Sequence, residues 1–155
     1  MKKINKAKLQ DFNLVTSAIN ERSILEILDS PFIAKLYYSF QTSKCLYFIT
    51  QYAQGGELNH YLKKERYFSE STSQFYCAEI VLALEYLHSN GIVYADLKPE
   101  NVLLDANGHI LLSDFGLSRF KSKKGTMQTT PEYMAPEQIL GVESFHAVDW
   151  WALVR

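Results

Sequence analysis

The residues best suited to do chemistry in this sequence lie in the stretch "GIVYADLKPENVLL", residues 91–104. Asp96, Lys98 and Asn101 occur close together there, and apolar runs flank them on both sides. A carboxylate can accept a proton from a hydroxyl group, and an amide oxygen can bind a hard cation. A lysine can neutralise negative charge that develops on a reacting group. The stretch therefore predicts a catalytic or binding site.

Two further acids follow along the chain, Asp114 in "DFG" and Glu137 in "APE". Each motif alone is a weak signal, because a carboxylate near an amide is most often the cap of a turn. In this order, and with "DLKPEN" intact, the motifs resemble the signature set of the eukaryotic protein kinases: the catalytic loop, the metal-binding motif and the end of the activation segment.

Longer segments narrow this resemblance. "YADLKPENVLLD", "DFGLSR", "TPEYMAPE" and "DWWAL" are similar to the AGC group of serine/threonine kinases, which includes the cyclic-nucleotide-dependent kinases. The resemblance implies an α+β, protein-kinase-like fold with two lobes. It also implies transfer of the γ-phosphate of ATP, with Mg²⁺ as the metal, to a Ser or Thr hydroxyl of a protein substrate.

The resemblance gives each residue of the catalytic segment a role. Asp96 would accept the proton of the substrate hydroxyl, and Lys98 would offset charge on the transferred phosphoryl group. Thr130 would support both of these side chains. Asn101 and Asp114 would bind the metal, because Mg²⁺ takes hard oxygen ligands and keeps several of its waters.

The first half of the chain contributes an expected ion pair. The segment "INERSIL" resembles the kinase helix whose acid, here Glu21, pairs with a lysine on a neighbouring strand. Family spacing makes that lysine Lys2, near the start of the chain. The alternative that Lys2 is a solvated lysine of a chain terminus stays open at this point.

The middle of the chain supplies the expected adenine site. Gln51 and Ala53, in "QYA", match the hinge whose backbone binds adenine in kinases. Thr50 before them matches a small residue that leaves room behind the ring, and Leu103 matches the residue under it. The resemblance therefore predicts a nucleotide pocket between these segments.

Two glutamates complete the expected binding set. Glu57 matches the acid that bonds the ribose of ATP, and Glu57 and Glu100 both match acids that face arginines upstream of the target hydroxyl in basophilic relatives. The alternative is that both are ordinary surface glutamates. The ATP-binding residues expected from the resemblance are Lys2, Glu21, Thr50, Gln51, Ala53, Glu57, Glu100 and Leu103.

The polar segment 116–132 is predicted to be a loop that carries regulation. Thr126 matches the phosphorylated threonine of AGC kinases, which implies an upstream activating kinase, and Arg119 matches a position that contacts its phosphate. A merely polar loop is the alternative. Ala95 stands where kinases usually have an arginine that also grips this phosphate. Since alanine offers no charge-assisted bond, we expect weaker control by phosphorylation and intact chemistry.

Periodicity and turn residues predict the elements that position these side chains. Helices are expected over 10–28, over 57–64, over about 70–89 with Ser69 as N-cap, and from near Val148, whose neighbour Asp149 matches an acid that anchors the catalytic loop. Strands are expected over 33–40 and 45–50 and in the short runs "IVY", "NVLL" and "HILLS", with a turn in "DANGH". The predicted buried stripes are Ile19, Ile24, Leu25 and Leu28, and Tyr76, Ile80, Leu84 and Leu87.

Bulk composition excludes several classes of protein. The chain has 155 residues, 47% hydrophobic content and a net charge of −1, which favours a globular domain over a nucleic-acid or anionic-membrane binder. No apolar run approaches the roughly 18 residues of a membrane span, and no signal peptide is expected because the basic start lacks an apolar stretch after it. The expected compartment is therefore cytoplasmic or otherwise intracellular, the nucleus included. Cys45 and Cys77 are expected to be buried, reduced thiols, with a disulfide or metal site as the alternative.

The ends of the sequence predict a partial kinase domain. No Gly-rich, phosphate-covering loop precedes Lys2, and the chain ends in the apolar run "VDWWALVR". We therefore expect a truncated fold over 1–155, with an N-lobe remnant in 1–50, a hinge in 51–56 and a C-lobe portion in 57–155.

Three interpretations of function remain open at this point. An AGC-like protein kinase is favoured by Asp96, Lys98, Asn101 and Asp114. A pseudokinase or truncated product that acts only as a binding module is favoured by the missing Gly-rich loop. The third is an incomplete reading of a gene, without a cellular function.

Overall fold

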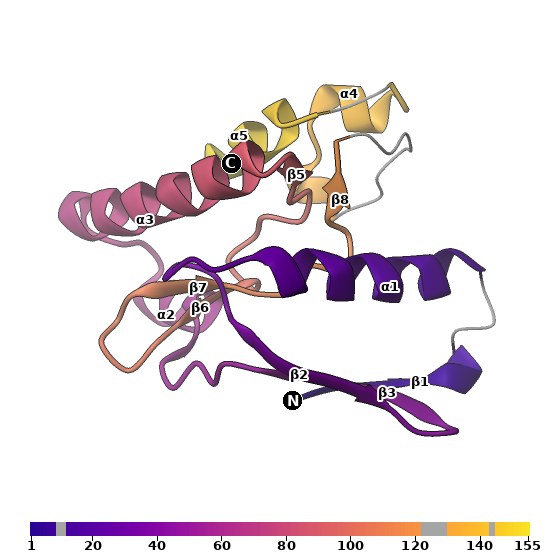
Figure 1. Cartoon of the computed structure of the whole chain (residues 1–155). Helices are drawn as coiled ribbons and strands as arrows, with labels where there is room; N and C mark the ends of the chain where they lie inside the picture. The colour runs from indigo at the N-terminus through magenta and orange to yellow at the C-terminus, as the bar shows by residue number, and fades with distance from the viewer. Residues whose placement is uncertain (9–11, 122–129, 143–144) are drawn as a thin grey trace.

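The computed structural model describes residues 1–8, 12–121, 130–142 and 145–155. Helices and strands alternate irregularly along the chain, so the predicted α+β class is confirmed. In Figure 1 a small sheet near the N-terminus is covered by helix α1, and the long helix α3 lies on the far side of α1 from that sheet.

The N-terminal sheet is antiparallel and has the strand order β1-β3-β2. Its strands are β1 (Lys2–Asn5), β2 (Leu36–Gln41) and β3 (Cys45–Thr50), and a short 3-10 helix, η1 (Lys6–Lys8), follows β1. Lys2 pairs with Phe48, so the first strand is held by the buried middle of β3. This pairing with β3 therefore fixes the position of the Lys2 backbone.

Helix α1 (Phe12–Ile27) lies against the sheet. Ala18, Ile24 and Leu25 are buried, and so is Glu21. Ile19, which we predicted to be buried, is 60% exposed. That prediction is wrong because the buried positions of the helix recur at helical intervals from Ala18, which turns the neighbouring Ile19 outward.

The strand predicted over 33–40 begins later than expected, at Leu36 instead of residue 33. Ile33 forms an isolated parallel bridge with Leu112, and Ala34 N donates to Leu112 O at 3.0 Å. Leu112 N in turn donates to Phe32 O at 2.8 Å. These residues thus pair with a distant segment, which ties the N-terminal part of the molecule to the second half of the chain.

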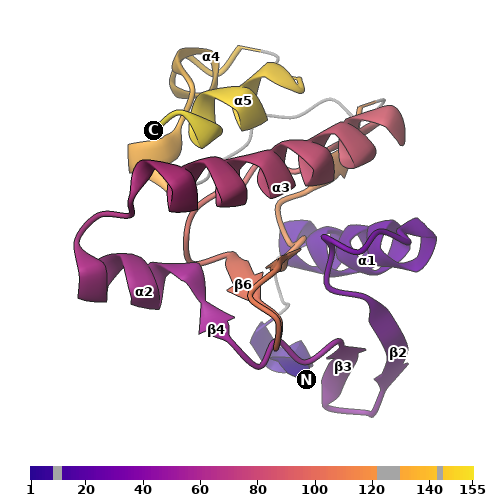
Figure 2. The same ribbon diagram turned by 90° about the vertical axis from the view of Figure 1, so that its left-hand side faces the viewer.

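The second half of the chain is mostly helical. Helix α3 begins where predicted: Ser69 caps it by accepting a hydrogen bond from Thr72 N at 3.2 Å, and Gly91, with φ of 69°, follows its end. In Figure 2, α3 lies between α5 on one side and strands β4 and β6 on the other. The helices are α2 (Leu58–Glu65), α3 (Glu70–Ser89), α4 (Pro136–Ile139) and α5 (Ala147–Leu153), with the 3-10 helix η2 (Pro131–Tyr133).

Two small antiparallel sheets carry the loops of interest. The first has the order β4-β6-β7, and its β6–β7 hairpin turns at the predicted Asn-Gly. The second pairs β5 with β8, so the prediction of loop throughout 116–132 is wrong at residues 119–120 and in η2. A strand of two residues has no periodicity of its own and forms here only because β5 lies beside it. These strands are β4 (Gly56–Glu57), β5 (Ile92–Val93), β6 (Val102–Leu104), β7 (Ile110–Leu112) and β8 (Arg119–Phe120).

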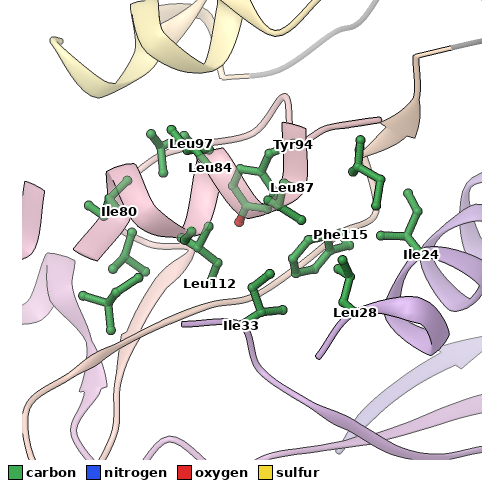
Figure 3. Close-up of a cluster of buried hydrophobic side chains, with 14 of the residues drawn as sticks. Ile24, Leu28, Ile33, Ile80, Leu84, Leu87, Tyr94, Leu97, Leu112 and Phe115 are labelled. Atoms are coloured by element: carbon green, nitrogen blue, oxygen red, sulfur yellow. The ribbon is translucent and has the colours of Figure 1, made fainter. Parts of the chain in front are cut away.

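The main apolar core joins α1, α3 and the strands around the catalytic segment (Figure 3). Leu84, Leu87 and Leu112 are fully buried in it. The cysteines differ from expectation: both are free thiols, but only Cys45 is buried and Cys77 is exposed. The buried face of α3 runs through Ile80, Ala83 and Leu87, and Cys77 lies outside it.

Candidate active site

Three charged residues from distant parts of the chain meet at one point. Lys2 Nζ donates to Glu21 Oε1 at 2.7 Å and to Glu21 Oε2 at 2.9 Å. It also donates to Asp114 Oδ1 at 2.8 Å. The strand β1, the helix α1 and the segment after β7 therefore converge on a single ammonium group. The expected pairing of Lys2 with Glu21 is present, and the alternative of a solvated terminal lysine does not hold.

The protonation of this cluster follows from its surroundings. Burial lowers the pKa of Lys2, but the carboxylates of Glu21 and Asp114 outweigh that effect and raise it above its ordinary value. Burial raises the pKa of Asp114, but Lys2, the Gly116 N–H and Lys98 outweigh it and lower the pKa. For Glu21, burial raises the pKa and Lys2 offsets only part of that. Lys2 thus stays charged and Asp114 ionised near neutral pH.

A cavity of about 250 Å³ opens beside this cluster. Thr50, Gln51 and Leu103 line it, as expected for an adenine site. Glu57 is exposed and Ala53 is half-buried, and neither of them lines it. The lining residues are Met1, Lys2, Glu21, Leu25, Ala34, Phe48, Thr50, Gln51, Leu103, Ser113, Asp114 and Phe115.

The catalytic segment is bound together by its own side chains. Asn101 Nδ2 donates to the carbonyl oxygen and to Oδ2 of Asp96, both at 2.8 Å. Lys98 Nζ lies 2.8 Å from Asp96 Oδ2 and 3.0 Å from Thr130 Oγ1. Asp96 is only 6% exposed. These contacts bring four of the predicted residues together and orient the Asp96 carboxylate, and they leave Asn101 Oδ1 as the amide atom suited to a cation.

A second buried acid, Asp149, accepts hydrogen bonds from the backbone of this segment. Asp149, only 1% exposed, accepts from Tyr94 N at 3.0 Å and from Ala95 N at 2.7 Å. His88 Nε2 lies 2.8 Å from its Oδ2, and the ring of His146 stacks on His88 at 4.2 Å. The two backbone bonds hold Ala95 in the left-handed region, with φ of 71°, just before Asp96. This is the anchoring contact that the sequence led us to expect of Asp149.

An apolar column connects the two halves of the site. The rings of Tyr94 and Phe115 meet edge to face at 5.1 Å, and the Tyr94 hydroxyl donates to the Ser113 carbonyl. Burial, followed by nearby carboxylates, raises the pKa of Tyr94 well above its ordinary value, so the hydroxyl remains a donor. Leu25 is buried in the same core, and Leu36 packs against it.

Asp114 itself has an unusual backbone conformation, with φ of 51°. A residue other than glycine in this region is uncommon and is held by its surroundings. Here Phe115 is buried on one side and Lys2 binds the carboxylate on the other. The strained position thus aims the Asp114 side chain at the cavity instead of the core.

The described residues contain no group of three or more His, Cys, Asp or Glu arranged to hold a metal ion. Asp114 and Asn101 offer one carboxylate and one amide oxygen. Mg²⁺ in phosphate-transfer sites is commonly bound by one or two protein oxygens together with phosphates and water. The donor set therefore fits Mg²⁺ delivered with a nucleotide.

A comparison with models of protein families shows to which family this chain belongs. The family described as "Protein kinase domain" matches residues 1–154. The chain belongs to the protein kinase domain family. Members of this family generally use ATP and Mg²⁺ and act on proteins. The truncated kinase-like fold expected from the motifs agrees with this match and with the arrangement of the sheet and helices.

Curated relatives place this kinase chain in the AGC group. It is 46% identical over 157 residues to a RAC family serine/threonine-protein kinase homolog of Dictyostelium discoideum, covering 98% of this chain and 35% of the relative. It is 49% identical over 154 residues to the cAMP-dependent protein kinase catalytic subunit of the same organism, covering 99% and 24%. It is 51% identical over 137 residues to ribosomal protein S6 kinase beta of Caenorhabditis elegans, covering 86% and 25%. The chain thus spans between 24% and 35% of the length of these relatives.

The remaining predicted positions of the kinase site are placed as follows. Arg119 lies on β8 and is buried at 8% exposure, whereas Thr126 lies outside the described residues. Glu57 ends β4 opposite Leu103, and Glu100 is exposed beside the catalytic segment. Within the described ranges, no helix combines the length and apolar character that a bilayer crossing requires.

Sequence reasoning missed several polar residues that organise this kinase site. Ser118 Oγ donates to the Tyr94 carbonyl oxygen at 2.9 Å, and His88 Nε2 lies 2.8 Å from Oδ2 of Asp149, the acid that binds the backbone of this segment. Asn59 Nδ2 donates to Glu100 Oε1 at 2.9 Å. A polar residue among apolar helical positions was the available signal for His88 and Asn59, but nothing local indicated their partners.

Proposed function

We propose that this chain is a catalytic portion of an AGC-group protein serine/threonine kinase, which transfers the γ-phosphate of ATP to a Ser or Thr hydroxyl of a protein. The observation that carries the proposal is the junction of Lys2 with Glu21 and Asp114 at the edge of a cavity. An ammonium group held between two acids is positioned to bind phosphate oxygens, and one of those acids is positioned to bind Mg²⁺.

The cavity supports a nucleotide site. Thr50, Gln51 and Leu103 would contact adenine, with Ala53 of the hinge 51–56 contributing backbone groups and Glu57 the ribose contact. Asp114 and Asn101 would hold Mg²⁺. When bound, MgATP supplies the phosphoryl group, and the metal neutralises charge on its oxygens.

The catalytic segment supports proton acceptance from a hydroxyl. Asp96 is buried, yet its carboxylate is charge-balanced by Lys98 and fixed by Asn101. It would accept the proton of the substrate hydroxyl as the oxygen attacks. Thr130 holds the Lys98 ammonium in place, so that Lys98 can offset negative charge on the transferred group.

The substrate and the setting are also part of the proposal. Two exposed acids, Glu57 and Glu100, favour protein substrates with Arg or Lys upstream of the target hydroxyl. Thr126 is the proposed site for an upstream activating kinase, with Arg119 as a phosphate contact. We expect a cytoplasmic setting, which the two free thiols suit.

Thermal unfolding with and without MgATP tests nucleotide binding. At a MgATP concentration of about 100 times Kd, we expect unfolding to shift upward by about 5–10 °C. Lys2→Met and Asp114→Asn should abolish most of this shift, because they remove the phosphate and metal contacts. Lys63→Met, an exposed lysine of α2, is the matched control and should keep it.

Radiometric assay with a generic basic serine peptide then tests transfer. Phosphate incorporation that disappears in Asp96→Asn supports the kinase. A thermal shift without incorporation would favour the alternative, a pseudokinase that acts as a binding module. If neither a thermal shift nor phosphate incorporation is observed, and a hydrophobic dye binds strongly, a catalytically impaired fragment would be favoured.

A further inference from the structure

Asn59 is a buried polar residue whose side chain binds an exposed acid of another segment. It lies near the start of α2, is 9% exposed, and its Nδ2 donates to Glu100 Oε1 at 2.9 Å. Its backbone N–H donates to Pro99 O at 3.2 Å. The first turn of α2 and the Pro99–Glu100 turn of the catalytic segment are thus joined by two hydrogen bonds.

The bond from Asn59 orients Glu100 without neutralising it. A neutral amide takes one acceptor position of the carboxylate, and about three remain. Within the described part of the chain, no lysine, arginine or histidine forms an ion pair with Glu100 or Glu57. Glu100 therefore presents its carboxylate in a fixed orientation at the surface.

Other acidic residues lie near Glu100, on the side of the 3-10 helix η2. Burial, and then the charges of Glu100 and Glu132, raise the pKa of Tyr133, so these groups lie near one another. Glu57 precedes α2 directly, at the end of β4. Thr130, which binds the catalytic Lys98, comes just before η2. A cation bound here would lie close to the catalytic segment.

We propose that Asn59 is a specificity-determining residue: it presets the Glu100 carboxylate to receive an arginine upstream of the target hydroxyl. The proposal rests on the proposed kinase function and deepens its substrate preference. A guanidinium group binds a carboxylate through two parallel hydrogen bonds, so it gains from a carboxylate whose plane is already fixed. A neutral isostere cannot form this pair.

Peptide binding and phosphorylation by Asn59→Leu test this role. The probes are two fluorescent serine peptides, one with arginine at the second and third positions before the serine, the other with neutral citrulline there. We expect the wild-type chain with MgATP to prefer the arginine peptide. Asn59→Leu should reduce that preference about five- to tenfold. The reduction should come from a higher Kd or KM for the arginine peptide and not from a lower kcat. His60→Ala, the adjacent exposed residue, is the matched control and should leave it unchanged.

A double-mutant cycle separates this role from a structural one. In a Glu100→Gln background, Asn59→Leu should change the preference no further, because the two residues act through one contact. If Asn59→Leu weakens the binding of both peptides equally, or if its effect is independent of Glu100, the role of Asn59 is only structural and the proposal is wrong. Asn59→Ser, too short to reach Glu100, replaces the leucine variant if that unfolds.

Failure of the kinase function gives a different result. If neither peptide is phosphorylated but binding still favours arginine through Asn59, the proposed transfer reaction fails and the specificity role stands. If the wild-type chain binds both peptides equally, the specificity role is overturned regardless of phosphorylation.

Discussion

At the scale of single residues, Asp149 combines three polar contacts at a buried position. Its carboxylate accepts from Tyr94 N and Ala95 N and contacts His88. Removing it leaves buried backbone donors without a partner, each of which costs about 1–3 kcal/mol. Catalytic geometry and stability are therefore coupled at this one side chain.

We predict that Asp149→Ala lowers the free energy of unfolding by about 3 kcal/mol, measured by urea denaturation. Glu85→Ala, at an exposed position of the nearby helix α3, should change it by less than about 0.5 kcal/mol. A loss below about 1 kcal/mol in the Asp149 variant would contradict the proposed anchoring.

Ala95 raises a question of regulation at the same scale. Its side chain is buried with Val93, Ala135 and Val148 and makes no polar contact with the catalytic residues. By the kinase resemblance, an arginine at this position would bind phosphate on Thr126, which lies outside the described residues. The effect of the alanine on control by phosphorylation therefore stays a prediction.

We predict that phosphate on Thr126, introduced by semisynthesis, raises the melting temperature of Ala95→Arg by about 3 °C or more beyond its effect on the wild-type chain. The expected gain comes from new charge-assisted hydrogen bonds. An equal effect of phosphorylation on both forms would show that alanine does not weaken phosphate control.

At the scale of elements, a buried acid ties helix α3 to the β6–β7 hairpin. Glu79 accepts from Ile110 N at 2.9 Å, and its other oxygen lies 2.6 Å from His109 Nδ1. The hydrogen bond to Glu79, and then its charge, raise the pKa of His109. Because the folded state favours protonated His109, this stabilisation is fully present below the unfolded pKa of about 6.5 and is lost as pH rises through the higher folded pKa.

We predict that His109→Gln reduces the free energy of unfolding more at about pH 6 than at about pH 8.5, measured by urea denaturation across this range. His60→Gln removes an exposed histidine of α2 and should show no such trend. A deficit of equal size at both pH values would mean that the charged contact contributes nothing.

At the scale of the whole molecule, the site depends on bringing distant parts of the sequence together. Lys2 and Glu21 come from the first elements, and Asp114 lies 112 positions from Lys2. Glu21 is buried, so its charge is stabilised by Lys2 and destabilised by loss of water. The pair therefore orients Lys2 more than it stabilises the fold.

We predict that Glu21→Gln raises the MgATP concentration needed for a half-maximal thermal shift about tenfold, while the melting temperature without nucleotide changes by only a few degrees. Thermal unfolding over a MgATP titration measures both quantities. An unchanged half-maximal concentration would show that Lys2 needs no partner on α1.

The sequence by itself determined the elements that depend on neighbouring residues, and it predicted the groups that are proposed to react. The Ser69 cap and the Asn-Gly turn appear as predicted because a cap or turn forms among residues a few positions apart. The order of the catalytic, DFG and APE motifs was enough to indicate a kinase, since each motif is a short run of side chains with a distinct chemical role.

Only the tertiary structure decided which of those groups meet. The late start of β2, the short strand β8 and the exposure of Cys77 depend on packing against distant segments. The contacts of Lys2 with Asp114, His88 with Asp149 and Asn59 with Glu100 likewise join residues far apart in the chain. Such contacts form only once burial of the shared core has placed their backbones, and no local preference encodes them.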